Sequence, residues 1–123
     1  MRVSFEPDDI AALDRAREVR IETQARGGDV HRTIIWIVVD DDRVFVRSHR
    51  GEAARWYREA LENPAVAIHV ERRRIPATAI PATDPDSIER TSGALLKKYE
   101  NDPSARSMVR DEILGTTLRL EPA

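Results

Sequence analysis

The chain has 123 residues, of which 41% are hydrophobic and 34% charged, and its formal net charge is −2. This length suits a single domain over residues 1–123, and the nearly balanced charge gives no case for binding nucleic acid or a membrane surface. The sequence contains no cysteine, which excludes disulfides and thiolate chemistry. It has no apolar signal or membrane-spanning run either, so we expect a cytoplasmic protein.

The N-terminal part predicts a helix followed by a half-buried strand. Residues 6–9, Glu-Pro-Asp-Asp, are typical of a helix start, because proline loses nothing at the first helical position and acids there oppose the helix dipole. Apolar spacing carries this helix to about Glu18. Apolar and polar residues then alternate from Val19 to Ala25, which is the period of a strand with one buried face, and residues 27–29 predict a turn.

The central part predicts a hairpin of two strands. Residues 31–39 are β-branched and apolar with almost no alternation, which indicates a strand buried on both faces. Residues 40–43, Asp-Asp-Asp-Arg, suit a tight hairpin turn. In the following strand, Val44 and Val46 should lie on one face, with Phe45 and Arg47 on the other.

The remaining sequence predicts helices that interrupt further strands. After a helix over residues 52–62, residues 66–70 alternate as a strand. Residues 72–81 form another strand whose two prolines favour an edge or bulged position. A helix over 84–100, a short helical piece from Pro103 to about Val109 and a strand over 116–120 complete the chain. The pattern predicts an α+β fold, with about six mostly antiparallel strands curled into a barrel and flanked by helices.

The loop between the second hairpin strand and the following helix carries the clearest chemical signal. Arg47, Ser48 and Arg50 precede Gly51, so two guanidinium groups, a hydroxyl and backbone N–H groups could surround a phosphate. The two arginines can converge on one anion only if the chain turns at residues 48–49. The alternative is an ordinary polar strand end whose arginines pair with nearby acids.

Other polar and aromatic residues point less directly to function. Histidine can relay protons near neutral pH, but His31 is interpreted as a solvated strand entry. The histidines lack the spacing of metal ligands, so no metal site is predicted. Trp36 and Trp56 could stack on a planar ligand, and for Trp56 burial in the core is the better interpretation. The arginines at 72–74 are interpreted as a solvated strand end, with RNA contact as the alternative.

Several segments together resemble a known superfamily. Residues 35–39 (Ile-Trp-Ile-Val-Val), residues 44–51 (Val-Phe-Val-Arg-Ser-His-Arg-Gly) and residues 55–58 (Arg-Trp-Tyr-Arg) are similar to those of pyridoxamine-phosphate-oxidase-like split-barrel proteins. The likeness is closest to a branch of small domains of unknown function. The deazaflavin-dependent nitroreductases are relatives with a similar Trp-Tyr-Arg segment before Asn-Pro, which here is Asn63-Pro64.

This resemblance implies a split-barrel homodimer that binds FMN or a deazaflavin and transfers hydride or electrons to or from a small-molecule redox substrate. Carried over by position, the residues that would hold the cofactor phosphate are Arg47, Ser48 and Arg50. Those that would line its ribityl chain or ring are Arg32, Thr33 and Ile35. No catalytic residue is assigned. The alternative is a cofactor-free split-barrel module that binds a ligand or serves a structural role.

Overall fold

The computed structural model describes residues 4–123 as a seven-stranded sheet with three α-helices and three 3₁₀ segments. The strands are β1 (Val19–Gln24), β2 (Val30–Ile35), β3 (Val38–Asp40), β4 (Arg43–Val46), β5 (Ala65–Val70), β6 (Arg73–Pro81) and β7 (Leu118–Pro122). The helices are α1 (Pro7–Arg15), α2 (Arg55–Glu62) and α3 (Pro85–Lys98), and the 3₁₀ segments are η1 (Gly51–Ala53), η2 (Ala105–Val109) and η3 (Asp111–Thr116).

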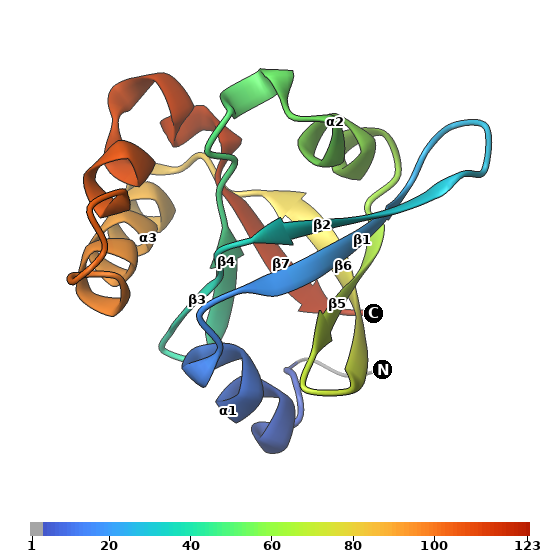
Figure 1. Cartoon of the computed structure of the whole chain (residues 1–123), viewed down its shortest axis with the longest axis horizontal. Coiled ribbons are helices and arrows are strands. Elements are labelled where there is room, and N and C mark those ends of the chain that lie inside the picture. Colours follow the sequence, from blue (N-terminus) through green and yellow to red (C-terminus); the bar gives the residue numbers. More distant parts are fainter. Residues whose placement is uncertain (1–3) are drawn as a thin grey trace.

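All the strand pairs are antiparallel, and the sheet has the order β2-β1-β5-β6-β7-β4-β3. The sheet curls into a half-barrel, with α1 and α2 at its two ends and α3 beside β3 and β4 (Figure 1). The predicted α+β class and the antiparallel barrel are therefore confirmed. The observed sheet has seven strands, whereas the sequence predicted about six.

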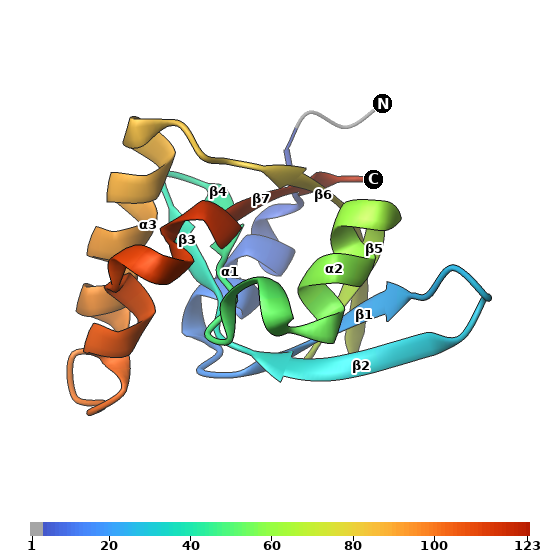
Figure 2. The ribbon, with the colours of Figure 1, turned by 90° about the horizontal axis from the view of Figure 1, so that it is seen from above.

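The sheet encloses one hydrophobic core and presents part of its other face to a second. In the main core, alternate residues of the strands pack with α1 and α2; its largest members include Leu13, Ile21, Ile37, Trp56, Tyr57, Ile68 and Leu118. The second core joins the opposite face of β3 and β4 to α3 and the 3₁₀ segments, through residues such as Phe45, Leu95, Tyr99, Met108 and Ile113. Figure 2 shows these two layers of helices on either side of β4.

The predicted hairpin around the acidic turn is confirmed. Strands β3 and β4 pair from Asp40 with Arg43 to Val38 with Phe45. The two turn residues, Asp41 and Asp42, have φ values of 53° and 61°, and aspartate tolerates this left-handed conformation better than most residues. The alternation along β4 is also as predicted, because its valines face the main core and Phe45 faces the second.

The prediction of one buried strand over residues 31–39 is wrong. The segment forms two strands, β2 and β3, which lie at opposite edges of the sheet and are separated by Trp36 and Ile37. Strand β2 is largely exposed, with Val30 and Ile34 at 54% and 57% exposure. Its apolar residues thus mark an uncovered sheet edge, not a strand buried on both faces.

The prediction that prolines place residues 72–81 at an edge or in a bulge is also wrong. Strand β6 lies inside the sheet, between β5 and β7. Its pairing with β7 runs only from Ala77 to Pro81, so Pro76 lies just before that ladder and Pro81 at its end. Both prolines therefore avoid the middle of the β6–β7 ladder, where a missing N–H group would cost a hydrogen bond.

Two of the helix predictions hold with adjusted bounds. Helix α3 begins after Asp84, whose side chain accepts a hydrogen bond from Ser87 N at 3.0 Å, as a helix-capping aspartate does. The helix predicted over residues 52–62 is a 3₁₀ turn followed by α2. Within residues 4–123, none of the helices is both long enough and apolar enough to cross a membrane.

Candidate functional site

A cleft of about 620 Å³ opens where the end of β2, the loop after β4 and the start of α2 meet. We call it the loop cleft. It combines apolar and aromatic side chains with several cations and one carboxylate, and its lining residues are Glu18, Thr33, Ile34, Ile35, Trp36, Arg47, His49, Arg50, Ala54, Arg55, Trp56, Ser104 and Met108. Such a lining suits a ligand with a planar apolar part and a negatively charged part.

The loop that borders this cleft is a tight turn fixed by its own hydrogen bonds. Ser48 is fully buried, and its Oγ donates to the Gly51 carbonyl at 2.7 Å while its N–H donates to Thr116 Oγ1 at 3.1 Å. Gly51 has a φ of 64°, which favours glycine, and a Cβ there would lie 3.4 Å from Ile113. The Gly51 N–H donates to the Ser48 carbonyl at 3.1 Å, so the chain turns at residues 49–50, one residue later than the phosphate hypothesis placed the turn.

Arg47 anchors the base of the loop inside the protein. It is only 2% exposed, and its guanidinium donates to four oxygen atoms at 2.9–3.2 Å; the acceptors are Thr117 Oγ1, Ser92 Oγ, the Met108 carbonyl and the Ile88 carbonyl. Burial lowers the pKa of Arg47 to about 10, so it is still charged at neutral pH. Arg47 therefore contributes positive charge to the wall of the cleft while tying the loop to α3, η2 and the residue before β7.

Two exposed arginines supply the uncommitted positive charge of the cleft. Arg50 and Arg55 lie at the two ends of the short segment that joins the loop to α2. Within residues 4–123, neither guanidinium has a hydrogen-bond or ion-pair partner. Their donors are thus free to bind an anion, and Glu18 is the single carboxylate on the same lining.

His49 lies between these arginines and the 3₁₀ segments. Its Nε2 is 2.9 Å from Ser107 Oγ, and the Ser107 hydroxyl donates its proton to the Ser104 carbonyl at 2.7 Å. Since a serine hydroxyl has one proton, Nε2 is the donor to Ser107 and Nδ1 of the neutral ring is left without a proton. His49 is therefore held in one tautomer beside the cleft.

The aromatic part of the cleft is held rigidly. Trp36 stacks on Tyr99 with ring centroids 3.9 Å apart and an interplanar angle of 6°. The Tyr99 hydroxyl donates to the Arg17 carbonyl at 2.8 Å and accepts from Ile37 N at 3.3 Å. Burial raises the pKa of Tyr99 to about 12, which keeps the phenol neutral and able to donate. The indole of Trp36 is therefore fixed in place before any ligand arrives.

The structure brings four of the six predicted cofactor residues to the loop cleft. These are Thr33, Ile35, Arg47 and Arg50. The other two are not on its lining. Ser48 is buried beneath the loop, and Arg32 lies on the far face of β2, where its Nε is 3.7 Å from Glu22.

His31, which was interpreted as a solvated strand entry, instead bonds to a buried carboxylate. Its Nδ1 lies 3.0 Å from Glu59 on α2, and Glu59 also accepts from the Thr23 hydroxyl at 2.7 Å. Burial disfavours ionisation of Glu59, but the hydrogen bonds from Thr23 and His31 outweigh it and lower the pKa of the carboxyl. Within residues 4–123, no group of three or more His, Cys, Asp or Glu side chains could hold a metal ion.

The sequence did not single out every residue of the cleft. Arg55 and Trp56 do carry a local signal, because an arginine followed by an aromatic residue opens the helix after the loop. Ser104 and Met108 carry none. They reach the cleft only because η2 packs against the loop, more than 50 residues further along the chain.

A family model described as "Uncharacterized protein conserved in bacteria (DUF2255)" matches residues 9–120. The chain belongs to the DUF2255 family. A comparison of the DUF2255 chain with curated proteins finds no match. The family description assigns no activity, so the evidence for function on this chain is the cleft itself.

Solved structures with the same fold include a heme storage protein and a reductase. HutZ, the heme storage protein of Vibrio cholerae, is 18% identical and has a TM-score of 0.67, with 100% of the DUF2255 chain and 92% of HutZ covered. An F420-H2 dependent reductase (FDR-A) is 16% identical and has a TM-score of 0.65, with 89% and 97% covered. A third structure, described as a domain-swapped dimer, is 16% identical with a TM-score of 0.65, covering 94% and 87%. These likenesses confirm the predicted split-barrel fold of the DUF2255 chain.

Proposed function

We propose that the loop cleft binds a planar redox cofactor with a phosphate group, FMN or a deazaflavin, and that the protein is an oxidoreductase acting on a small molecule. The observation that carries this proposal is the pairing of an aromatic and aliphatic lining with two unpartnered arginines in one cleft. The reductase among the structural relatives, which is named for F420, supports a deazaflavin as one of the two candidates. When bound, the cofactor would supply hydride or electron transfer.

In this proposal the residues of the chain divide into two roles. Arg50 and Arg55 contact the phosphate, since their donors are uncommitted, while Arg47 and Ser48 hold the loop in the conformation that presents them. Thr33, Ile35 and the indole of Trp36 line the cleft where the ribityl chain or the ring of the cofactor would lie. The arginine cations favour the ionised phosphate, and the apolar wall excludes water from the ring.

A fluorescence titration with FMN, riboflavin and a deazaflavin tests this assignment. Arg50→Ala and Arg55→Ala are each expected to weaken FMN binding about ten- to a hundred-fold, because each removes one or two charge-assisted hydrogen bonds of roughly 1.5–3 kcal/mol. Arg58→Ala is the matched control: Arg58 is exposed on the same helix but is not part of the lining. Riboflavin, which lacks the phosphate, should bind weakly and equally to all four proteins.

Failure of the wild-type protein to bind any of these compounds would eliminate the cofactor proposal. The chain would then be better described as a split-barrel module that works without a flavin. If FMN binding were unaffected by both arginine changes, the phosphate would have to lie elsewhere.

We further propose that the protein is a homodimer joined along the β2 edge. This edge has unpaired backbone groups and two exposed apolar side chains, Val30 and Ile34, of which Ile34 also lines the loop cleft. One structural relative is described as a domain-swapped dimer. Sedimentation equilibrium at micromolar concentration should give twice the chain mass of 14.0 kDa, and Ile34→Lys should shift it toward 14.0 kDa. A wild-type mass of 14.0 kDa would contradict the proposal.

A further inference from the structure

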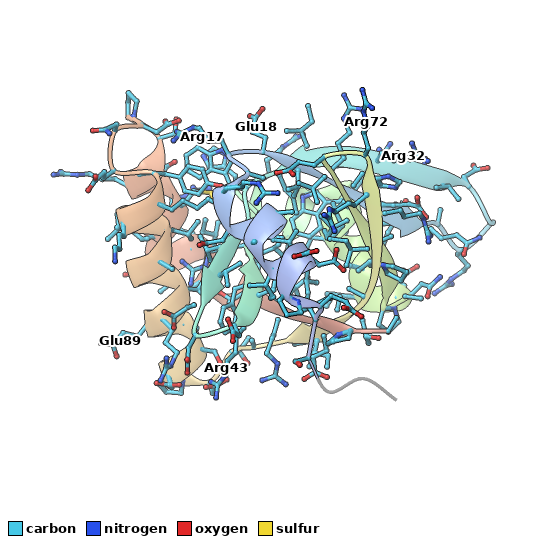
Figure 3. All side chains as sticks on the ribbon, turned by 90° about the horizontal axis from the view of Figure 1, so that it is seen from below. Arg17, Glu18, Arg32, Arg43, Arg72 and Glu89 are labelled. Atoms are coloured by element: carbon cyan, nitrogen blue, oxygen red, sulfur yellow. The ribbon has the colours of Figure 1, made fainter. Side chains whose placement is uncertain are left out.

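A second concave surface lies on the outer face of the sheet, away from the loop arginines. It is a groove of about 580 Å³ whose cations come from β1, from the β5–β6 turn and from the start of β6; they are Arg20, Arg72, Arg73 and Arg74. We call it the basic groove. Figure 3 shows Arg72 reaching outward on the same side of the molecule as Arg32, whose Nε lies 3.7 Å from a Glu22 carboxylate oxygen.

Two of the four arginines are neutralised by ion pairs. Arg73 binds Asp9 at 3.0 Å, and Arg74 binds both carboxylate oxygens of Glu22, the shorter contact being 2.7 Å. Hydrogen bonds from Arg74 and His69 lower the pKa of the Glu22 carboxyl to about 2, so it is ionised throughout the physiological range. These pairs leave Arg73 and Arg74 with little uncompensated charge.

The other two arginines have no such partner. Within residues 4–123, Arg20 and Arg72 make no hydrogen bond or ion pair through their guanidinium groups. Arg20 lies directly across from His69 in the β1–β5 ladder, so both side chains are on the outer face. Of the two carboxylates on the lining, Glu71 is held by Arg15 at 2.6 Å, which leaves Glu18. Free positive charge thus exceeds free negative charge.

The backbone at Arg72 adds an independent indication of function. Glu71 and Arg72 are the two central residues of the β5–β6 turn, with φ values of 48° and 67°. Glycine or asparagine is the stable choice for this conformation, and a long side chain there is uncommon. In the β3–β4 turn the same positions are filled by Asp41 and Asp42, and aspartate tolerates a positive φ better than a long side chain does. The turn thus places arginine where glycine would be more stable, as is seen where a side chain is needed for binding.

We propose that the basic groove is a second anion site, which binds a small phosphate-bearing molecule through Arg20 and Arg72. Guanidinium groups present planar pairs of N–H donors that match the oxygen atoms of phosphate, and the guanidinium groups of Arg20 and Arg72 are not taken up by carboxylates within residues 4–123, as that of Arg74 is by Glu22. The basic groove adjoins the loop cleft, with which it shares Glu18 and Ile34, but its arginines are different ones and the proposal does not depend on the cofactor proposed there.

The turn provides a test in which stability and binding should change in opposite directions. Binding is measured by calorimetric titration of pyrophosphate at low ionic strength into four proteins: the wild type, Arg72→Gly, Arg20→Met and Asp42→Gly. The midpoint of thermal unfolding is measured for each of the four. Arg72→Gly should raise the midpoint, because glycine fits a positive φ, yet weaken pyrophosphate binding at least tenfold. Asp42→Gly makes the same backbone change in the other turn and should raise the midpoint without weakening binding. Arg20→Met should weaken binding at least tenfold.

Arg50→Ala, measured in the same way, separates this site from the loop cleft. It should leave one pyrophosphate site of unchanged affinity. The proposal is overturned if Arg72→Gly binds pyrophosphate as the wild type does, if Arg50→Ala alone abolishes binding, or if the wild type does not bind pyrophosphate at all. The last two outcomes leave the flavin titrations of the loop cleft unaffected, so the two proposals can fail separately.

Discussion

Replacing Arg47 by methionine is expected to lower the free energy of unfolding by about 3 kcal/mol or more. The guanidinium is buried and donates to Thr117, Ser92 and two backbone carbonyls, so its removal leaves several oxygen atoms without a donor. Urea denaturation followed by circular dichroism gives the change in midpoint. Arg43→Met is the matched control, because Arg43 is an exposed residue at the start of β4, the strand that ends just before Arg47, and it should change stability by no more than about 0.5 kcal/mol.

An unchanged midpoint for Arg47→Met would show that water replaces the lost donors. The network around Arg47 would then be dispensable for folding, and the residue would be available for a ligand. The expected loss of stability also explains why Arg50 and Arg55 are better probes of cofactor binding. A variant that unfolds cannot report on a phosphate contact.

Trp56→Ala is expected to destabilise the protein by roughly 3–5 kcal/mol, as truncation of a buried aromatic side chain does. Trp56 is 5% exposed, belongs to the main core, and packs edge-on against Tyr57 with ring centroids 6.2 Å apart. Chemical denaturation measures the loss. Leu61→Ala serves as the control on the same helix, since Leu61 is 46% exposed and should lose less than about 1 kcal/mol.

A midpoint for Trp56→Ala equal to that of the wild type would mean that the side chain is not part of the core despite its burial. Trp56→Phe keeps an apolar ring in the cavity and should recover most of the lost stability. Since Trp56 also borders the loop cleft, a fall in FMN affinity in this conservative variant would indicate that the indole itself contacts the ligand.

Features set by neighbouring residues could be predicted from the sequence. The alternation of Val44, Phe45 and Val46 follows from the geometry of any strand, and Asp84 caps a helix three residues from its partner. The burial of Trp56 was likewise predicted from the apolar face of its helix and is confirmed. Leu61, near the C-terminal end of the same helix, is 46% exposed, so the helix does not bury all of its apolar residues.

Features set by distant residues could not be predicted in this way. Nothing between residues 31 and 39 signals a break, because the change of direction at Trp36 and Ile37 is stabilised by Tyr99, 62 residues from Ile37. The partners of Arg47 lie 41 to 70 residues away, so a guanidinium committed to the protein looks in the sequence like one free for phosphate. The sequence therefore indicated the loop as a candidate site, whereas only the structure shows that the protein itself binds the guanidinium of Arg47 and, within residues 4–123, leaves the donors of Arg50 unpaired.

The position of β7 between β6 and β4 has a consequence for the order in which this protein can fold. Strand β4 is made early and already pairs with β3, but its other neighbour is a strand more than 70 residues later in the chain. During synthesis on the ribosome, the β3–β4 hairpin must therefore wait, with one side unpaired, until β7 has emerged. Sheets that depend on such long-range pairing fold slowly, over milliseconds to seconds, and expose unpaired strands to other chains meanwhile. Nascent copies of this protein are thus most vulnerable to aggregation just before the final strand joins the sheet.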